Sequence, residues 1–278
     1  MATRNPDLQS LSEAIESVFC QTFRDFELII VDDGSAVPVD IENSTTQVNS
    51  SDVNVSVYRI EPSGLGAALN YGIKQAHGEY IARIDDDDMM LPKRLQRQVE
   101  YLDTHPDVSC VGTWHYDKYI DKYYPHRKFP TDHEGIVSQL LQSRFALAHT
   151  TLMFRRKAFD AIGGYRIPGG GQDLDLELQL GTVGRLANLP AYLSIYTMSA
   201  SGLGTINPQK YAAYIFALQD VEKRGLYPEH THLIRGSIIK LQKINNSRLK
   251  SLREKWKRRL IIMRIQFLGK KTNPLLER

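Results

Sequence analysis

Hydrophobic positions in the first hundred residues follow two spacings, one typical of helices and one of strands. Leu11, Ala14, Ile15 and Val18 recur at three- and four-residue intervals, which predicts an amphipathic helix. The elements predicted in this half are, in order, a helix over 10–23, strands over 26–35 and 53–60, a helix over 64–78, a strand over 80–84 and a helix over 93–102, which Pro92 opens. Strands that alternate with helices favour an α/β fold, with a mostly parallel central sheet and helices on both faces.

The pattern is less regular in the second half of the chain. It predicts a strand over 108–116, an aromatic and basic loop over 116–130, a short helix over 136–141, a strand over 150–154, a glycine-rich loop over 163–172, the start of a helix at 174–180 and a last strand over 193–196. From Pro208 onward the pattern is helical. We therefore expect an α/β domain over 1–204 and a C-terminal helical region over 205–278.

Composition matches an ordinary globular protein, with 278 residues of which 42% are hydrophobic and 24% charged. Cys20 and Cys110 lie far apart without metal-ligand spacing, which favours two structural thiols in a reducing, cytoplasmic environment. The sequence contains neither a signal peptide nor a run of about 18 apolar residues. We therefore expect a cytoplasmic protein without a membrane span.

The net charge of +3 is unevenly distributed. Residues 248–271 contain ten Lys or Arg and one acid, Glu254, so the rest of the chain carries about −6. A mildly acidic body argues against nucleic acid as a partner. The basic segment places Leu249, Leu252 and Trp256 on one helical stripe. Such a helix either lies on an anionic membrane surface, at the inner face of the cell membrane, or packs on its own domain. If removing the residues after Asn246 leaves liposome pelleting unchanged, the membrane interpretation fails.

Acidic residues follow two separate predicted strands. Asp32 and Asp33 follow "LIIV", and Asp85–Asp88 follow "YIARI". Ligands of open parallel α/β sheets bind at the carboxyl ends of strands, and carboxylates with substrate phosphates suit Mg²⁺ or Mn²⁺. The alternative for either acidic segment alone is a solvated acidic turn.

Four segments in order resemble one known family. They are "AIESVFCQTFRDFELIIVDDGS", "GLGAALNYGIKQAHGEYIARIDDDD", "HTTLMFRRKAFDAIGGY" and "GGQDLDLELQL". Together they resemble the inverting family 2 glycosyltransferases, which have the GT-A nucleotide-sugar-binding fold. The resemblance covers roughly residues 1–196. Each segment alone is weakly specific, whereas the four in register are highly specific.

The resemblance implies a set of donor-binding residues. Asp33 matches the acid that binds the donor nucleobase. Asp85 and Asp87 match the outer acids of the family's DxD motif, which handle the donor and the metal, with Asp86 in the variable middle position. Because Asp88 is also an acid, the DxD motif can be aligned with these four residues in two ways that differ by one residue.

The resemblance also implies a catalytic base and a sugar or acceptor pocket. Asp173 matches the base, and His149 and Thr150 match positions that line the pocket. Gln172 stands where the family usually has Glu, so it can hydrogen-bond the acceptor or orient Asp173. Asp175 is the alternative base, and the alternative for both aspartates is an ordinary acidic helix N-terminus.

The N-terminal segment departs from the family pattern. "MATRNPD" matches only the end of the family's first strand, with Asn5 at the turn, and we expect Arg4 and Asn5 beside the donor base. Arg4 stands where an aromatic residue commonly stacks on the base. Either the true start lies upstream, where the codons preceding Met1 would encode the rest of the strand, or the chain is a natural truncation.

The function implied by the resemblance is transfer of one sugar from a nucleoside-diphosphate sugar, UDP- or dTDP-linked, with Mn²⁺ or Mg²⁺ as cofactor and inversion at the anomeric carbon. The acceptor would be a glycan or a lipid-linked sugar in surface polysaccharide synthesis. Two alternatives stay open. One is a sugar-nucleotide pyrophosphorylase, although the glycine-rich basic loop typical of those enzymes is missing from "MATRNPDLQSLSEA". The other is a non-catalytic nucleotide- or glycan-binding remnant of a transferase.

Overall fold

The first helix shows how local sequence sets the fold. Helix α1 (Leu8–Phe19) begins at Asp7, whose carboxylate accepts a hydrogen bond from the Ser10 backbone N–H (2.9 Å) and so satisfies one of the free donors of the first turn. Its buried face carries the apolar residues of the predicted stripe, including Leu11 and Ile15. The predicted helix over 10–23 is therefore confirmed, with both ends shifted.

The computed structural model describes residues 1–40, 53–167, 170–198 and 208–246. The other helices are α2 (Leu65–Gln75), α3 (Arg94–Thr104), α4 (His133–Leu141), α5 (Arg156–Ala161), α6 (Gln172–Val183), α7 (Pro208–Lys223), α8 (Thr231–Asn246) and the 3₁₀ turns η2 (His149–Thr151) and η3 (Pro228–His230). The strands are β1 (Ala2–Thr3), β2 (Glu27–Asp32), β3 (Asn54–Arg59), β4 (Tyr80–Ala82), β5 (Met89–Met90), β6 (Val108–Tyr119), β7 (Lys122–Pro125), β8 (Met153–Arg155) and β9 (Arg185–Thr197).

The strands form two sheets. Strands β1, β2 and β3 pair in parallel, in that order. The second sheet has the order β4-β8-β6-β9-β5, with β7 beside β6; β6 and β9 pair in parallel and the other pairs are antiparallel. The α/β class is confirmed, but the sheets are mixed rather than mostly parallel, since four of the seven strand pairs described are antiparallel. Each antiparallel pair includes at least one short strand.

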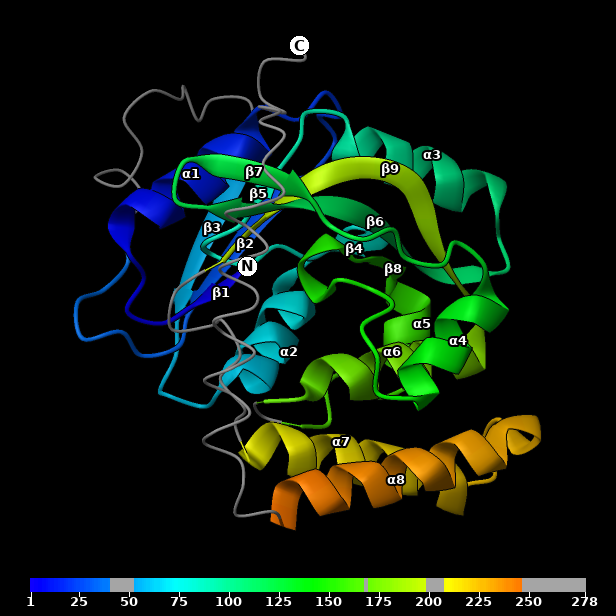
Figure 1. Cartoon of the computed structure of the whole chain (residues 1–278). Helices are drawn as coiled ribbons and strands as arrows, with labels where there is room; N and C mark the ends of the chain where they lie inside the picture. The colour runs from blue at the N-terminus through cyan, green and yellow to red at the C-terminus, as the bar shows by residue number, and fades with distance from the viewer. Residues whose placement is uncertain (41–52, 168–169, 199–207, 247–278) are drawn as a thin grey trace.

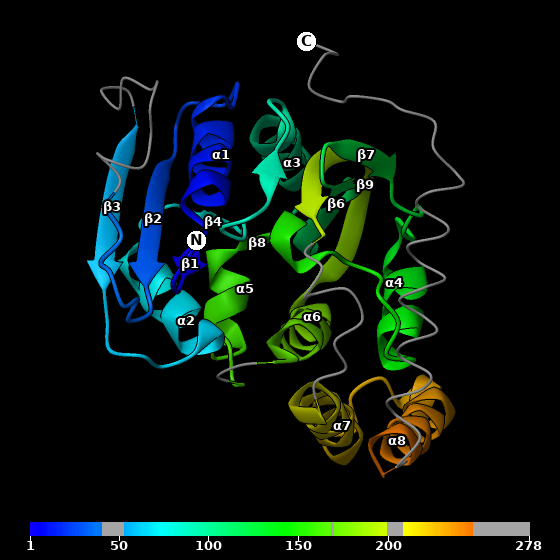
Figure 2. The same cartoon turned by 60° about the vertical axis from the view of Figure 1, so that its left-hand side comes forward.

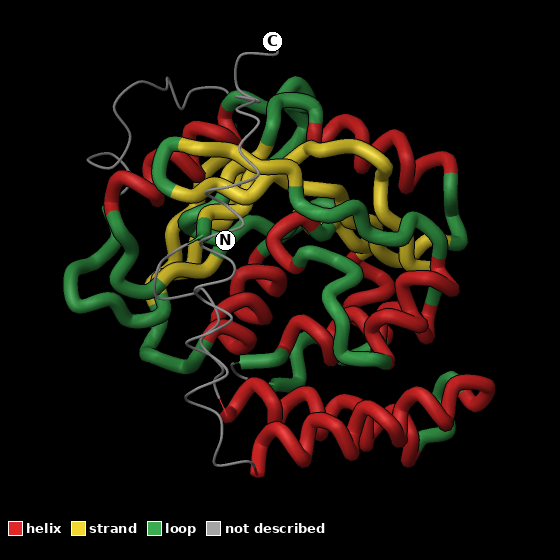
Figure 3. The backbone as a smooth tube through the Cα atoms, viewed as in Figure 1, coloured by secondary structure: helices red, strands yellow, loops and turns green. Residues whose placement is uncertain are grey.

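Helices cover both faces of the sheets (Figures 1 and 3). One core lies between the sheets and helices α1 and α3, and contains Leu11, Ile15 and Leu95. The other lies on the opposite face, under α2, α4, α5 and α6, and contains Leu140 and Leu176. Figure 2 shows α7 and α8 as a further pair beneath α6.

Part of the predicted loop over 116–130 is a hairpin. Tyr116–Tyr119 of β6 pairs with Lys122–Pro125 of β7, and Ile120 takes a positive φ of 55° at the turn. The prediction of a loop was wrong here because charged and aromatic residues alternate on an exposed ribbon, where the apolar pattern that marks a strand is weak. The strand predicted over 150–154 was also partly wrong, since it begins as the 3₁₀ turn η2.

The two C-terminal helices share a core with the rest of the chain. Leu218 and Val221 of α7 and Ile234 of α8 belong to the same buried cluster as Leu178 of α6. The division at residue 204 stays a prediction. No helix in the described ranges is long and apolar enough to cross a membrane. The basic segment 248–271 lies outside the described residues, so its contact with membrane stays a prediction.

A cavity of about 510 Å³ lies between β2 and β4. Strand β1 pairs with β2 only at Val31 and Asp32, so the earlier part of β2 has no strand on this side. The cavity is lined mainly by apolar residues of the facing elements, such as Leu28, Ile73 and Ala82.

We expect Phe154→Ala to destabilise the fold by about 3–5 kcal/mol. Phe154 is fully buried on β8 and its ring stacks on Phe159 with centroids 5.3 Å apart. Its removal leaves a cavity between β8 and α5. Urea unfolding measures the change, and Phe216→Ala, at a side chain that is 52% exposed, is the control. Equal effects of the two substitutions would contradict this description of the core.

Candidate functional site

The four consecutive acids form a turn between β4 and β5. The Arg83 backbone N–H donates to the Leu152 carbonyl (2.8 Å), and the Asp85 N–H donates to the Thr150 hydroxyl (3.1 Å). Arg94, which is fully buried on α3, donates to the Arg83 carbonyl (2.7 Å). These contacts from η2, from the residue that follows it and from α3 fix the position of the backbone that leads into the turn.

Three of the four carboxylates have partners within the fold. Asp85 pairs with the buried Arg83 guanidinium at 2.5 Å. Asp86 accepts a hydrogen bond from the Thr3 hydroxyl, and Asp88, which is fully buried, accepts one from the Thr197 N–H (2.7 Å). Among the described residues, no side chain forms a hydrogen bond or ion pair with the Asp87 carboxylate, which makes it the acid best placed to bind a ligand.

The turn carries more negative charge than the surrounding residues neutralise. Burial, and then the charges of Asp85 and Asp86, raise the pKa of Asp87 to about 6. Burial followed by neighbouring acids also raises the pKa of Asp86 and of Asp88. For Asp85, burial acts to raise the pKa, but the Arg83 guanidinium reverses this and the net shift is downward.

These residues fit a divalent cation of the Mg²⁺ or Mn²⁺ type. The donor set consists of carboxylate oxygens, which such ions prefer. The raised pKa of Asp87 indicates that burial and the neighbouring acids disfavour its negative charge, which a bound cation would stabilise. Asp87 and Asp85 would hold the ion.

The raised pKa of Asp87 predicts a pH dependence of stability in metal-free buffer. Because the folded protein holds this proton up to about pH 6 and an unfolded aspartate only to its ordinary pKa of 3.8, the contribution of Asp87 to stability falls as the pH rises between these values. Asp87→Asn lacks this contribution. Its melting temperature should therefore rise relative to that of the wild type from pH 4 to pH 7 in EDTA. A difference that is independent of pH would contradict the raised pKa.

The predicted nucleotide-binding residues lie together at the ends of β1 and β2. Asn5 has a positive φ of 50°; its N–H donates to the Ser35 hydroxyl (2.8 Å), and its side-chain oxygen accepts from the Ala36 N–H (2.7 Å). Arg4 is exposed on the same turn. The Thr3 contact with Asp86 connects this turn to the acids.

Asp33 has a structural role that the sequence did not reveal. Its buried carboxylate accepts hydrogen bonds from the Ser63 N–H (2.7 Å), the Ser63 hydroxyl (2.9 Å) and the Gly64 N–H (3.0 Å). It thus holds the start of α2 against β2. A carboxylate has about four acceptor positions, so these three bonds leave about one position for a nucleobase.

His149 lies between the acid turn and α6. Its Nε2 is 2.8 Å from the Tyr165 hydroxyl. Burial, followed by the positive charge of Arg83, lowers the pKa of His149 to about 3, while the charges of Asp85 and Asp173 act in the opposite direction. The imidazole is therefore neutral at pH 7. Thr150, the next residue, is buried and contacts the acid turn through the Asp85 N–H.

Asp173 lies in the first turn of α6 and faces α7. Its Oδ2 accepts a hydrogen bond from the Tyr214 hydroxyl (3.2 Å) and is 3.6 Å from the Lys210 ammonium. Its Oδ1 is buried without a hydrogen-bond partner among the described residues, as is Oε1 of Gln172. Gly171, which precedes the helix with a φ of 98°, allows this close approach, because a Cβ there would lie 2.7 Å from that of Ala213.

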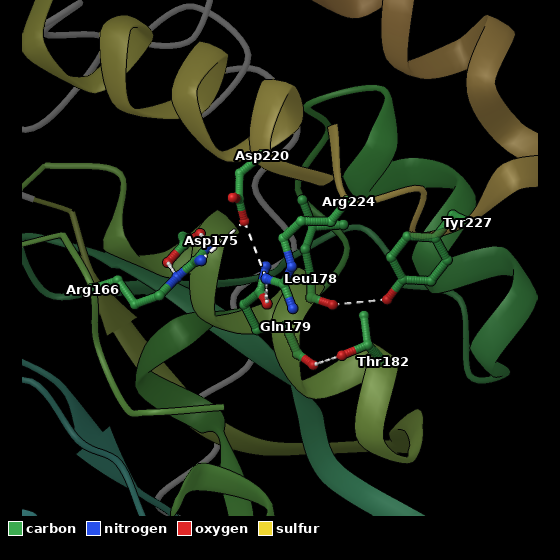
Figure 4. A network of polar contacts seen from close by, with 8 residues as sticks. All are labelled: Arg166, Asp175, Leu178, Gln179, Thr182, Asp220, Arg224 and Tyr227. Carbon is green, nitrogen blue, oxygen red and sulfur yellow. Dashed lines mark hydrogen bonds and ion pairs between the residues drawn. The ribbon is translucent and has the colours of Figure 1, made fainter. Parts of the chain in front are cut away.

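Asp175, the alternative base, is held in an ion pair. Arg166 binds both of its oxygens, through Nε (3.0 Å) and Nη2, and Asp175 is only 1% exposed. Arg166 also pairs with Asp220 of α7 (2.9 Å). Figure 4 shows this network, in which Asp220 in turn meets Arg224. Both Asp175 oxygens are thus occupied by Arg166, whereas one Asp173 oxygen has no hydrogen-bond partner among the described residues.

Sequence reasoning missed three residues that shape the site. Arg83 is a charged residue in an otherwise apolar strand directly before the acids, and this position was a readable signal. Lys210 and Tyr214 are spaced four apart and share a face of α7. No sequence signal related these two to Asp173, because the contact forms only when α7 packs on α6.

Comparison with known proteins identifies the family. The model of the family described as "Glycosyl transferase family 2" matches residues 1–163, which is more than half of the chain. The O-antigen biosynthesis glycosyltransferase WbnJ of Escherichia coli is 31% identical over 170 residues, which cover 60% of this chain and 65% of that protein. The amylovoran biosynthesis glycosyltransferase AmsE of Erwinia amylovora is 26% identical over 237 residues, which cover 83% of this chain and 85% of AmsE.

Solved structures agree with the fold. Residues 1–349 of S. aureus TarS, in complex with UDP-GlcNAc, superpose with a TM-score of 0.67 at 18% identity, over 89% of this chain and 72% of that one. A longer TarS chain is only 44% covered. The mannosyltransferase PcManGT of Pyrobaculum calidifontis, in complex with GDP-Man and Mn²⁺, gives 0.63 at 16% identity, over 99% of this chain and 75% of that one. With the family model, the acid turn and the layered α/β fold in agreement, this chain belongs to glycosyl transferase family 2.

Proposed function

We propose that this chain transfers a single sugar from a nucleoside-diphosphate sugar, with the help of a divalent cation and with inversion, to a glycan or lipid-linked acceptor in surface polysaccharide synthesis. The observation that carries the proposal is the Asp85–Asp88 turn, whose unpaired Asp87 has a raised pKa, together with His149 between this turn and Asp173. A site for a metal diphosphate and a candidate base thus belong to one electrostatically connected region.

Asp87 and Asp85 would hold a Mg²⁺ or Mn²⁺ ion at the donor diphosphate. When bound, such an ion supplies Lewis-acid stabilisation of the charge that develops on the leaving diphosphate. Arg83 keeps Asp85 ionised, and Arg94 holds the Arg83 carbonyl, so the chain itself orients this part of the site. Asp33, Arg4 and Asn5 are proposed to contact the nucleobase, and Asp86 the ribose or diphosphate.

Asp173 would accept the proton of the acceptor hydroxyl as that oxygen attacks the anomeric carbon. Lys210 and Tyr214 orient its Oδ2, and its Oδ1 is buried without a hydrogen-bond partner among the described residues, so the acceptor hydroxyl would have to enter this space to reach it. Gln172, His149 and Thr150 are proposed to line the sugar or acceptor pocket. A single displacement of this kind inverts the anomeric carbon without a covalent intermediate.

Relatives support the substrate classes of this proposal. WbnJ and AmsE are named for O-antigen and amylovoran biosynthesis, which favours a surface glycan as the product. The similar folds of TarS and PcManGT were solved with UDP-GlcNAc and with GDP-Man and Mn²⁺, respectively. We keep UDP or dTDP as the proposed nucleotide, because the family acid that Asp33 matches usually binds uracil.

A non-catalytic remnant is the second candidate, and the specific observation behind it is that Lys210 already pairs with Asp173. The family match does not support a sugar-nucleotide pyrophosphorylase.

The test is a screen of UDP-, dTDP- and GDP-sugars for binding and turnover, with Mn²⁺, Mg²⁺ or EDTA. The proposal expects one nucleotide class to bind only with metal and to be consumed, and a β-linked product from an α-linked donor by NMR. Metal-dependent donor binding, without sugar transfer to any acceptor in a glycan or lipid extract, would favour the non-catalytic remnant. Retention of the donor's anomeric configuration would contradict the single displacement.

A further inference from the structure

A second cluster of metal-ligand side chains lies on the β6–β7 hairpin, outside the acid turn. His115 and Asp117 are two residues apart on β6, so both side chains project from the same face of the strand. The His126 N–H donates to the His115 carbonyl (3.0 Å), which places His126 opposite His115 directly after β7. The pairing of the hairpin thus brings three residues that are separate in sequence onto one face.

The three side chains meet at the Asp117 carboxylate. His115 Nε2 lies 3.3 Å from Asp117 Oδ1, and His126 Nδ1 lies 2.8 Å from Asp117 Oδ2. Potential ligand atoms of all three lie within 4.8 Å of one another. In a tetrahedral zinc site with bonds of about 2.0–2.1 Å, neighbouring ligand atoms are about 3.3–3.4 Å apart, which is close to these separations.

Charge and burial favour a cation between these groups. Burial acts to raise the pKa of Asp117, but hydrogen bonds from His115 and His126 reverse this, so the carboxylate is ionised. Burial lowers the pKa of His115, which is only 2% exposed, so this imidazole is neutral at pH 7. The pair therefore offers one oxygen and one nitrogen ligand atom in a largely enclosed position, and both atom types suit Zn²⁺.

The arrangement also provides access and room to adjust. The imidazoles of His115 and His126 stack with centroids 4.4 Å apart and planes at 24°, so one ring must turn for both nitrogens to point at one ion. His126 is that ring, because its side chain is 27% exposed whereas His115 is enclosed. The Asp117 side chain is 19% exposed, so an ion can enter from solvent and keep a water as its fourth ligand.

We propose that His115, Asp117 and His126 form a binding site for a zinc-type transition-metal ion that ties the two strands of the β6–β7 hairpin together. Two imidazoles and one carboxylate suit Zn²⁺ or Co²⁺, whereas the all-carboxylate turn at Asp85–Asp88 suits Mg²⁺ or Mn²⁺. The two sites therefore select different ions, and the hairpin site is independent of the proposed transferase chemistry.

The ion would fix a segment that borders the proposed site. The Asp117 position on β6 pairs with Tyr196 on β9, and the next β9 residue, Thr197, donates its N–H to Asp88 of the acid turn. The His126 carbonyl accepts a hydrogen bond from the Tyr192 hydroxyl (2.9 Å), which also connects the hairpin to β9. Strand β9 thus connects the proposed metal site on the hairpin to the acid turn.

The test uses the full-length, untagged protein in millimolar Mg²⁺, which occupies the carboxylate turn. Co²⁺ is titrated while its visible absorption is followed, and Zn²⁺ is then used to displace it. We expect one equivalent of Co²⁺ with the intense absorption of tetrahedral coordination, which Zn²⁺ abolishes. His126→Gln should weaken Zn²⁺ binding by more than about 100-fold, beyond the usual cost of losing an outer-shell partner.

Two controls separate this site from others. His105→Gln changes an exposed histidine that stacks on Tyr101, and it should bind as the wild type does. Asp87→Asn should also keep the absorption, because it changes only the acid turn. The proposal is overturned if the wild type binds no Zn²⁺ in Mg²⁺, or if His126→Gln and Asp117→Asn, shown to be folded by circular dichroism, bind it as tightly as the wild type.

Discussion

Asp173→Asn is expected to lower sugar transfer by about 10³-fold while donor affinity stays within a factor of about three. General-base assistance by a positioned carboxylate typically contributes 10²–10⁴-fold, and Asn keeps the shape of Asp but does not accept the proton. Lys210 and Tyr214 would still meet a polar side chain at this place, so the fold should tolerate the change. Initial rates at saturating donor and acceptor measure the loss, and calorimetric titration with the donor measures the affinity.

The matched control is Asp160→Asn, which removes one negative charge from an exposed position on α5. It should leave both quantities unchanged. Activity of Asp173→Asn close to that of the wild type would show that another group is the base. Equal loss of donor binding and turnover would instead place Asp173 in the donor site.

Asp87→Ala is expected to weaken metal-dependent donor binding by about 10- to 100-fold, since a hydrogen bond or ion contact to a charged group contributes about 1.5–3 kcal/mol. Turnover should fall further, by about 10³-fold or more, because the same contact also supports the leaving diphosphate in the transition state. Titrations of UDP- and dTDP-sugars with and without Mn²⁺ would separate the two effects. The residual binding of the variant should no longer depend on Mn²⁺.

Asp160→Ala is the control for a lost carboxylate in this comparison as well. If wild type binds the donor equally well in EDTA and in Mn²⁺, the acid turn is not a metal site for the donor. If Asp87→Ala binds normally and Asp88→Ala does not, the register of the acids shifts by one residue. The burial of Asp88 and its bond to Thr197 argue against that shift.

Sequence reasoning predicted those parts of the fold where burial imposes a simple period. Helix α1 follows a stripe of apolar residues at helical spacing, and β2 follows a continuous apolar run, so both were predicted within a few residues. Strand β7 was not predicted, because none of its residues is fully buried and its sequence therefore shows no apolar pattern. Strand β9 was predicted only near its end, since polar Asn188, which is buried, interrupts the apolar pattern of its earlier part.

The candidate site shows the same division between local and long-range information. The acids at strand ends are local signals, and their clustering follows from the α/β layout. The partners of these acids are not local: Asp175 meets Arg166, and Asp33 meets Ser63. Such pairs depend on how loops and helices pack against one another. The periodic pattern of hydrophobic residues in a single sequence does not predict this packing. The roles assigned to individual residues therefore stay predictions.

Helix α7 has a consequence for exchanging parts between relatives. The same helix contributes Lys210 and Tyr214 to Asp173, Asp220 to the Arg166 network, and Leu218 and Val221 to the core shared with α6. The family match ends at residue 163, before Asp173 and before this helix. A chimera that took 208–246 from another transferase would therefore change both the charges around the proposed base and the packing of α7 on α6. Restoring activity would require compensating substitutions for both changes.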